Sequence, residues 1–196
     1  MIKRGEVVNI QLLENGSAIR AKFVECFVMT WDEFHVRKAQ WIAELAARNY
    51  AIDRAWYDHS LMWDRMSPEL PSIPFREALA FLRVQKGNVR FLSDVTAYGT
   101  KRRLLLADCE YIGFAAEWTA GELADLIEEE WFESYRLGMQ DCYNPYPVLP
   151  EELYVFDPDM TWCVVFTHET TDWESELDDP MKAAESRYCL ISKTTE

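Results

Sequence analysis

Two Thr-x-x-Glu motifs constrain the fold most strongly, because each marks the start of an amphipathic helix. In such a capping box the Thr side chain satisfies a backbone N–H of the first turn, and the Glu reaches back to the Thr. The first box, Thr30 to Glu33, predicts a helix with one face on a core. The apolar residues of that face are Phe34, Trp41, Ile42 and Leu45.

The second box, Thr119 to Glu122, predicts a helix over about 119–137. Apolar side chains recur every four residues along it and form the expected buried stripe. That stripe is Leu123, Ile127, Trp131 and Tyr135. The opposite face is acidic, and it comprises Glu122, Asp125, Glu129 and Glu133.

The sequence predicts several strands that alternate with further helices. The pair Asn15-Gly16 predicts a β-hairpin joining 6–13 to 18–24, because both residues tolerate the positive φ of tight turns. Helices are expected at 52–66 and at 74–85, the second opened by Pro74 and ended by Gly87. The other expected strands are 89–93, 104–106, 111–115, 153–156, 161–167 and 187–192.

This alternation predicts an α+β fold with a mainly antiparallel sheet and packed helices. We expect the whole chain, 1–196, to form a single domain with two lobes. The boundary between the lobes, or lobe seam, is expected near 94–103, where composition and charge change. No apolar run reaches the roughly 20 residues of a membrane helix. The N-terminal residues, MIKRGEVVNI, do not resemble a secretory signal, so we expect a cytoplasmic protein that does not contact membranes.

Cysteine and histidine usage predicts neither a metal site nor a cofactor. The five cysteines are widely spaced, without a CxxC pair, and the three histidines form no HExxH motif. We therefore expect reduced, mostly buried cysteines.

The charge of the chain is unevenly distributed. Residues 1–103 hold 16 Lys and Arg against 12 Asp and Glu, whereas residues 104–196 hold 4 against 22. The net charge of −14 opposes direct binding of nucleic acid and favours a cationic protein partner. The predicted partner-binding residues are Glu122, Asp125, Glu129, Glu133, Asp157, Asp159, Asp172, Glu174, Glu176, Asp178 and Asp179.

A catalytic alternative rests on Asp157-x-Asp159-x-Thr161 after an apolar strand. This pattern matches the nucleophile motif of the haloacid-dehalogenase-like phosphohydrolases. In that family, however, the motif opens a parallel α/β domain, and too few residues follow Thr161 here to complete one. A turn between two strands is the simpler interpretation, since Asp and Pro favour turns.

Two further alternatives stay open. A metal-assisted hydrolase would use Asp157, Asp159 and His168. A hydrolase with a cysteine nucleophile would instead use a catalytic triad of Cys163, His168 and Asp172. Cys163 falls in the middle of a predicted strand, which favours packing over nucleophilic exposure. A structural scaffold would use the acids only for solubility. We assign no catalytic residue.

The stretch from Glu117 to Glu169 contains ELADLIEEEWFESYRL, LPEELYVFD and WCVVFTHE. It is similar to a group of uncharacterised bacterial proteins of accessory and mobile genetic elements. The resemblance implies an accessory protein of a bacterium or phage, of the toxin-immunity, anti-CRISPR or anti-restriction type. The leading hypothesis rests on the acidic second half of the chain and on the lack of a convincing catalytic motif. It is a non-enzymatic acidic protein that inhibits a nucleic-acid-handling partner by occupying its cationic surface.

Overall fold

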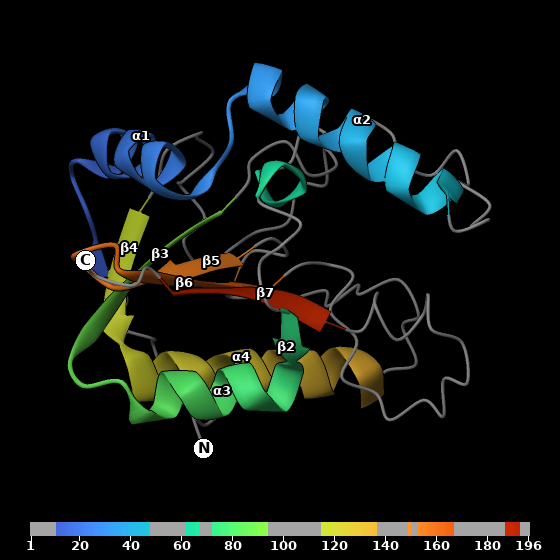
Figure 1. Cartoon of the computed structure of the whole chain (residues 1–196). Helices are drawn as coiled ribbons and strands as arrows, with labels where there is room; N and C mark the ends of the chain where they lie inside the picture. Colours follow the sequence, from blue (N-terminus) through green and yellow to red (C-terminus); the bar gives the residue numbers. More distant parts are fainter. Residues whose placement is uncertain are drawn as a thin grey trace.

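The protein folds around one antiparallel sheet with helices on both faces (Figure 1). The computed structural model describes residues 11–47, 62–66, 72–93, 115–136, 149, 153–166 and 187–192. The helices are α1 (Gly16–Phe27), α2 (Trp31–Ala47), the 3-10 turn η1 (Trp63–Arg65), α3 (Phe75–Val84) and α4 (Ala120–Arg136). The strands are β1 (Gln11–Leu12), β2 (Ser72–Pro74), β3 (Asn88–Ser93), β4 (Ala115–Thr119), β5 (Leu153–Phe156), β6 (Trp162–Phe166) and β7 (Arg187–Ser192).

The seven described strands follow the order β1-β4-β3-β5-β6-β7-β2, and every neighbouring pair is antiparallel. β5 lies at the centre, with all four of its residues buried. Its side chains alternate between the two faces, as the period of two in a strand requires. This arrangement confirms the predicted α+β class with an antiparallel sheet.

One face of the sheet carries α3 and α4, which lie side by side (Figure 1). Leu79 and Leu82 of α3, Leu123 and Ile127 of α4, and Val155 of β5 are at most 1 % exposed and share this core. Leu123 and Ile127 belong to the stripe predicted for this helix. The side chains at 131 and 135 lie outside the part that the structure describes.

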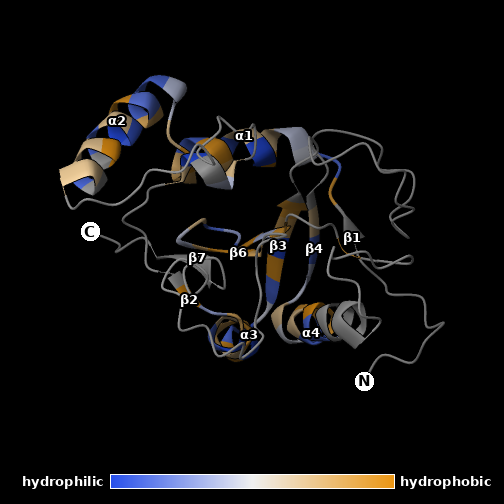
Figure 2. Ribbon diagram, turned by 90° about the vertical axis from the view of Figure 1, so that its right-hand side faces the viewer, coloured by the Kyte–Doolittle hydropathy of each residue, from blue (hydrophilic) through white to orange (hydrophobic). Residues whose placement is uncertain are grey.

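The other face carries α1 (Figure 2), and the residues of η1 share the same core. Phe23 of α1 is fully buried, and its ring centroid lies 5.5 Å from that of Tyr154 and 5.0 Å from that of Phe156. The Tyr154 hydroxyl accepts a hydrogen bond from the backbone N–H of Trp63 at 3.0 Å. Both faces of β5 are therefore covered by helical elements.

The hairpin predicted around Asn15-Gly16 was wrong, because residues 18–24 form α1 and not a strand. Ile19, Phe23 and Phe27 are four residues apart and all buried, which is the spacing of one helix face. The carbonyl of Asn15 accepts hydrogen bonds from the first turn, so the Asn-Gly pair begins a helix here. Burial of this stripe outweighs the local turn preference of Asn-Gly.

The predicted capping box at the start of α2 is confirmed. The Glu33 carboxylate accepts hydrogen bonds from the Thr30 N–H at 2.9 Å and hydroxyl at 2.7 Å, and the Glu33 N–H donates to the Thr30 hydroxyl at 3.3 Å. The expected core face of α2 is only partly formed, since Phe34 and Ile42 are half-buried. The side chains of Trp41 and Leu45 are not among those described.

Most other predicted elements agree with the structure within a few residues. The helix at 74–85 and the strands at 89–93, 153–156, 161–167 and 187–192 are confirmed as α3, β3, β5, β6 and β7. Of the helix expected at 52–66, the described part is the 3-10 turn η1. The strand at 104–106 and the lobe seam at 94–103 lie outside the described residues, so the division into lobes stays a prediction. No helix in the described ranges is long and apolar enough to cross a membrane.

Protonation of Glu33 should loosen the first turn of α2. The two hydrogen bonds from Thr30 hold the pKa of Glu33 below its usual value of 4.5. A lowered folded-state pKa means that the stabilisation is fully present above pH 4.5 and is lost as the pH falls through the folded-state pKa. We expect amide exchange of residues 31–34 to accelerate in that acidic range.

The control for this titration is Glu33→Gln, which keeps a side chain that can cap but cannot ionise. In this variant the amide exchange of the first turn should not accelerate in the same range, once intrinsic pH effects are subtracted. An identical pH response in both proteins would contradict the role of the carboxylate.

Candidate acidic binding surface

The position of α4 is set by its N-terminus and its apolar stripe. The Thr119 hydroxyl donates a hydrogen bond to the Glu122 carboxylate, which joins the two side chains of the predicted capping box. The N–H of Ala120 donates to the carbonyl of Gly87 at 3.2 Å, which ties the helix start to the turn after α3. Gly87 has a φ of 88°, a left-handed conformation that favours glycine. With the stripe buried, the rotation of α4 about its axis is fixed.

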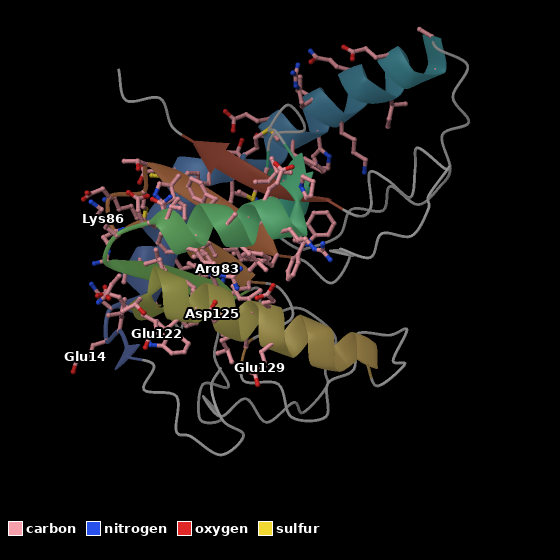
Figure 3. All side chains as sticks on the ribbon, turned by 90° about the horizontal axis from the view of Figure 1, so that it is seen from below. Glu14, Arg83, Lys86, Glu122, Asp125 and Glu129 are labelled. Atoms are coloured by element: carbon pink, nitrogen blue, oxygen red, sulfur yellow. The ribbon has the colours of Figure 1, made fainter. Side chains whose placement is uncertain are left out.

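That rotation leaves the predicted acidic residues of α4 at the surface. Glu122, Asp125 and Glu129 are exposed, and Figure 3 shows all three on the same side of the molecule. Glu122 and Glu129 are seven residues apart, two helical turns, so their Cα atoms are separated by about 10 Å along the axis. Carboxylates held at this spacing on a fixed helix form a defined charge pattern. The side chain of Glu133 lies outside the described part.

Arg83 of α3 partly neutralises this surface. Its guanidinium donates to Asp125 at 2.8 and 3.0 Å and to Glu128 at 2.5 Å, between the two helices (Figure 3). The hydrogen bond to Glu128 contributes most to raising the pKa of Arg83 above its ordinary value, so the guanidinium stays charged. Asp125 is therefore part of an ion-pair network that joins α3 to α4.

The role of Arg83 was missed from the sequence. Its carboxylate partners lie 42 and 45 residues further along the chain, so no local spacing indicates the contact. The available signal is weak: a cation in the last turn of one amphipathic helix and acids in the first turns of another. Such a signal becomes specific only when the two helices are known to be neighbours.

Asp157 has a structural role in the turn between β5 and β6. Its carboxylate accepts hydrogen bonds from the Thr161 N–H at 2.6 Å, the Thr161 hydroxyl at 2.9 Å and the Trp162 N–H at 3.0 Å. The N–H of Met160 donates to the Asp157 carbonyl at 2.9 Å and closes the turn. Asp159 is exposed in the same turn. The antiparallel pairing of β5 with β6 confirms the turn interpretation of Asp-Pro-Asp.

The remaining predicted binding residues, Asp172, Glu174, Glu176, Asp178 and Asp179, lie outside the described residues. Within the described part, the predicted acids thus fall on two separate elements, helix α4 and the β5–β6 turn. The basic cluster Lys101–Arg103 also lies outside it. Whether the acids form one continuous face therefore stays a prediction.

The described residues that could serve a hydrolase do not form an evident active site. Among them, no group of three His, Cys, Asp or Glu side chains is placed to hold a metal ion. Cys163 is fully buried in β6. β6 leads away from Asp157, and its last residue, Phe166, pairs with Leu153 at the far end of β5. His168 follows outside the described residues.

Comparison with protein-family models, curated proteins and solved structures gives no match for this chain. The resemblance of residues 117–169 to bacterial accessory proteins therefore stays a prediction.

Replacing Asp157 should destabilise the protein, whereas replacing Asp159 should not. Asp157→Ala removes three hydrogen bonds to a turn that is partly buried, so we expect a loss of about 1–3 kcal/mol in the free energy of unfolding. Asp159→Ala changes the same charge at an exposed position and should stay within about 0.5 kcal/mol of the parent. Urea denaturation of both variants measures the difference. Equal stabilities would contradict the structural role of Asp157.

The contact between Arg83 and Asp125 can be measured by a double-mutant cycle. Arg83→Gln, Asp125→Asn and the double variant should give a coupling free energy of about 0.5–1 kcal/mol, because both side chains are well exposed to solvent. The coupling should shrink at high salt, where exposed charges are screened. A cycle between Arg76→Gln and Asp125→Asn is the control, and an equal coupling there would contradict a specific pair.

Proposed function

We propose that this protein is a non-enzymatic, acidic binding protein that inhibits a nucleic-acid-handling partner by occupying the cationic surface of that partner. The proposal extends to an anti-CRISPR, anti-restriction or toxin-immunity type of inhibitor acting in the cytoplasm. The observation that supports it best is the exposure of Glu122, Asp125 and Glu129 on one fixed helix. The partner would be a protein, and the chain itself would bind neither nucleic acid nor membranes.

The geometry of α4 supports a binding role over general solubility. Solubility requires acids anywhere on the surface, whereas these acids stand on a helix held by a capping box and a buried stripe. A fixed helix presents its charges without first having to be ordered, so binding costs less conformational entropy. Carboxylates separated by one and two helical turns offer a repeated negative charge to a groove that normally accommodates a phosphate backbone.

Arg83 divides these acids into two groups. Asp125 and Glu128 are already paired with an internal cation, so a partner would have to compete for them. Glu122 and Glu129 point along another line of the helix, and Figure 3 shows Glu129 on the side of α4 away from α3. We infer that Glu122 and Glu129 make the main contacts with the partner.

A hydrolase is less well supported. Asp157, which that mechanism would need as a nucleophile or metal ligand, uses both carboxylate oxygens to hold the β5–β6 turn. A group committed to three hydrogen bonds within its own turn is a poor nucleophile, since attack would break them.

Charge changes at Glu122 and Glu129 test the proposal. Glu122→Gln keeps a side chain that can cap α4, and Glu129→Lys reverses a charge. The matched control is Glu14→Gln with Glu25→Lys, the same total change at exposed positions in α1 and in the turn before it. Immobilised parent protein should capture from a bacterial lysate a nucleic-acid-binding protein that is released by added DNA or RNA.

The measurement is the affinity of the captured and purified protein for each variant. The α4 variant should bind about tenfold more weakly than the parent at low salt, because tenfold corresponds to the loss of two modest charge contacts. The control should bind like the parent. The parent should also block binding of labelled nucleic acid by the captured protein. Capture that is indifferent to nucleic acid, or equal binding by both variants, would contradict the proposal.

A further inference from the structure

Helix α2 carries an apolar stripe that the described part of the fold covers only partly. None of the described helices and strands packs extensively on α2, and it extends away from the sheet in two views (Figures 1 and 2). Trp31 is 42 % exposed, and Phe34 and Ile42 are only half-buried. At 17 residues, the helix is about 25 Å long. This length is sufficient for pairing with another helix.

The sequence of α2 has the spacing of a helix that pairs with another helix. In a heptad, apolar residues alternate at spacings of three and four, at the a and d positions. Starting from Trp31, these positions are Trp31, Phe34, Lys38, Trp41 and Leu45. Four of the five are large and apolar. The flanking e positions are His35 and Ile42, and the flanking g positions are Arg37 and Glu44.

The charges at the g positions distinguish an antiparallel pair of α2 helices from a parallel pair. In an antiparallel pair of identical helices, g positions face g positions, so Arg37 of each copy would meet Glu44 of the other copy. The two-fold axis repeats this ion pair. In a parallel pair in register, g faces e, so neither charge would find an opposite charge. Charge complementarity therefore favours the antiparallel arrangement.

Lys38 points to the same arrangement. A parallel pair in register would place Lys38 against Lys38 of the second copy in the core, which repels. The antiparallel pair instead places Lys38 beside Trp41 of the second copy, where a lysine can interact with the aromatic ring. Lys38 already has this preference within the chain, because its Nζ lies 5.7 Å from the centroid of the Phe34 ring.

From these observations we propose that α2 is a dimerisation helix, which pairs antiparallel with α2 of a second copy of this chain. The net charge of −14 opposes association through most of the surface. α2 is nearly balanced, with Arg37 and Lys38 against Asp32, Glu33 and Glu44, so two copies approach through it with little repulsion.

The start of α2 is fixed in a way that suits this role. The guanidinium of Arg65 lies 4.5 Å from the centroid of the Trp31 ring, and it donates a hydrogen bond to the Met29 carbonyl at 3.2 Å. The Met29 N–H in turn donates to the Arg65 carbonyl at 2.9 Å. These contacts hold the junction between α1 and α2, so the direction in which α2 leaves the body is defined. A paired helix then places both copies in one defined orientation.

Sedimentation equilibrium of the full chain between about 1 and 200 µM tests the proposal, a range suited to an interface at the small end of stable ones. The parent should reach a monomer–dimer equilibrium. Arg37→Glu and Glu44→Arg should each weaken the dimer about tenfold, since each replaces two attractive pairs by two repulsive ones. The double variant restores both pairs with reversed signs, so it should dimerise like the parent.

The controls are Arg20→Glu and Glu25→Arg on α1, which make the same charge changes elsewhere on the surface and should not affect the dimer. Circular dichroism confirms that each variant is folded. A parent that stays monomeric over the whole range overturns the proposal. A dimer that is insensitive to both single reversals, or a double variant as weak as the single ones, also overturns it.

Discussion

The burial of β5 and β6 on both faces is the constraint on which the rest of the structure depends. Phe156 and Cys163 face one core, and Val155 and Val164 face the other, so neither sheet face of this hairpin is left to water. Helices therefore have to cover both faces of this sheet, although an antiparallel sheet commonly leaves one face exposed to solvent. α1 and η1 cover the first face, and α3 and α4 cover the second. Each of these helices is thereby positioned by the strand residues that it covers.

The surface of α4 follows from this constraint. Once Leu123 and Ile127 are buried against the sheet, the residues on the other side of the helix have to face solvent. Glu122, Asp125 and Glu129 are exposed for this reason. α3 lies beside α4 and brings Arg83 within reach of two carboxylates. The charge pattern of this surface is thus a product of helix packing, and not of the composition of α4 alone.

Much of the fold could be predicted from local patterns. The capping box at Thr30, the strands β5 and β6, and the stripe of α4 are predicted from local patterns, and each was confirmed where the structure describes it. The hairpin at Asn15-Gly16 failed because Phe23 packs against Tyr154 and Phe156, which lie more than 130 residues away in the sequence. The pairing of Arg83 with α4 could not be predicted for the same reason, because its partners lie 42 and 45 residues away in the sequence. For the candidate site, the exposure of Glu122, Asp125 and Glu129 agrees with the predicted acidic face of this helix, and their binding role stays a prediction. Asp157 instead holds its own turn.

The turn between β5 and β6 restricts which residues can occupy position 160. Met160 has a φ of 57°, a left-handed conformation that glycine adopts most easily, yet its side chain is 2 % exposed within the core beneath α1. Glycine would relax the backbone and leave a hole, and a β-branched residue would fit the backbone poorly. A long, unbranched apolar side chain satisfies both requirements. A sequence that shares this hairpin should therefore show a narrow choice at this position, next to an exposed Asp159 that is under no such restriction.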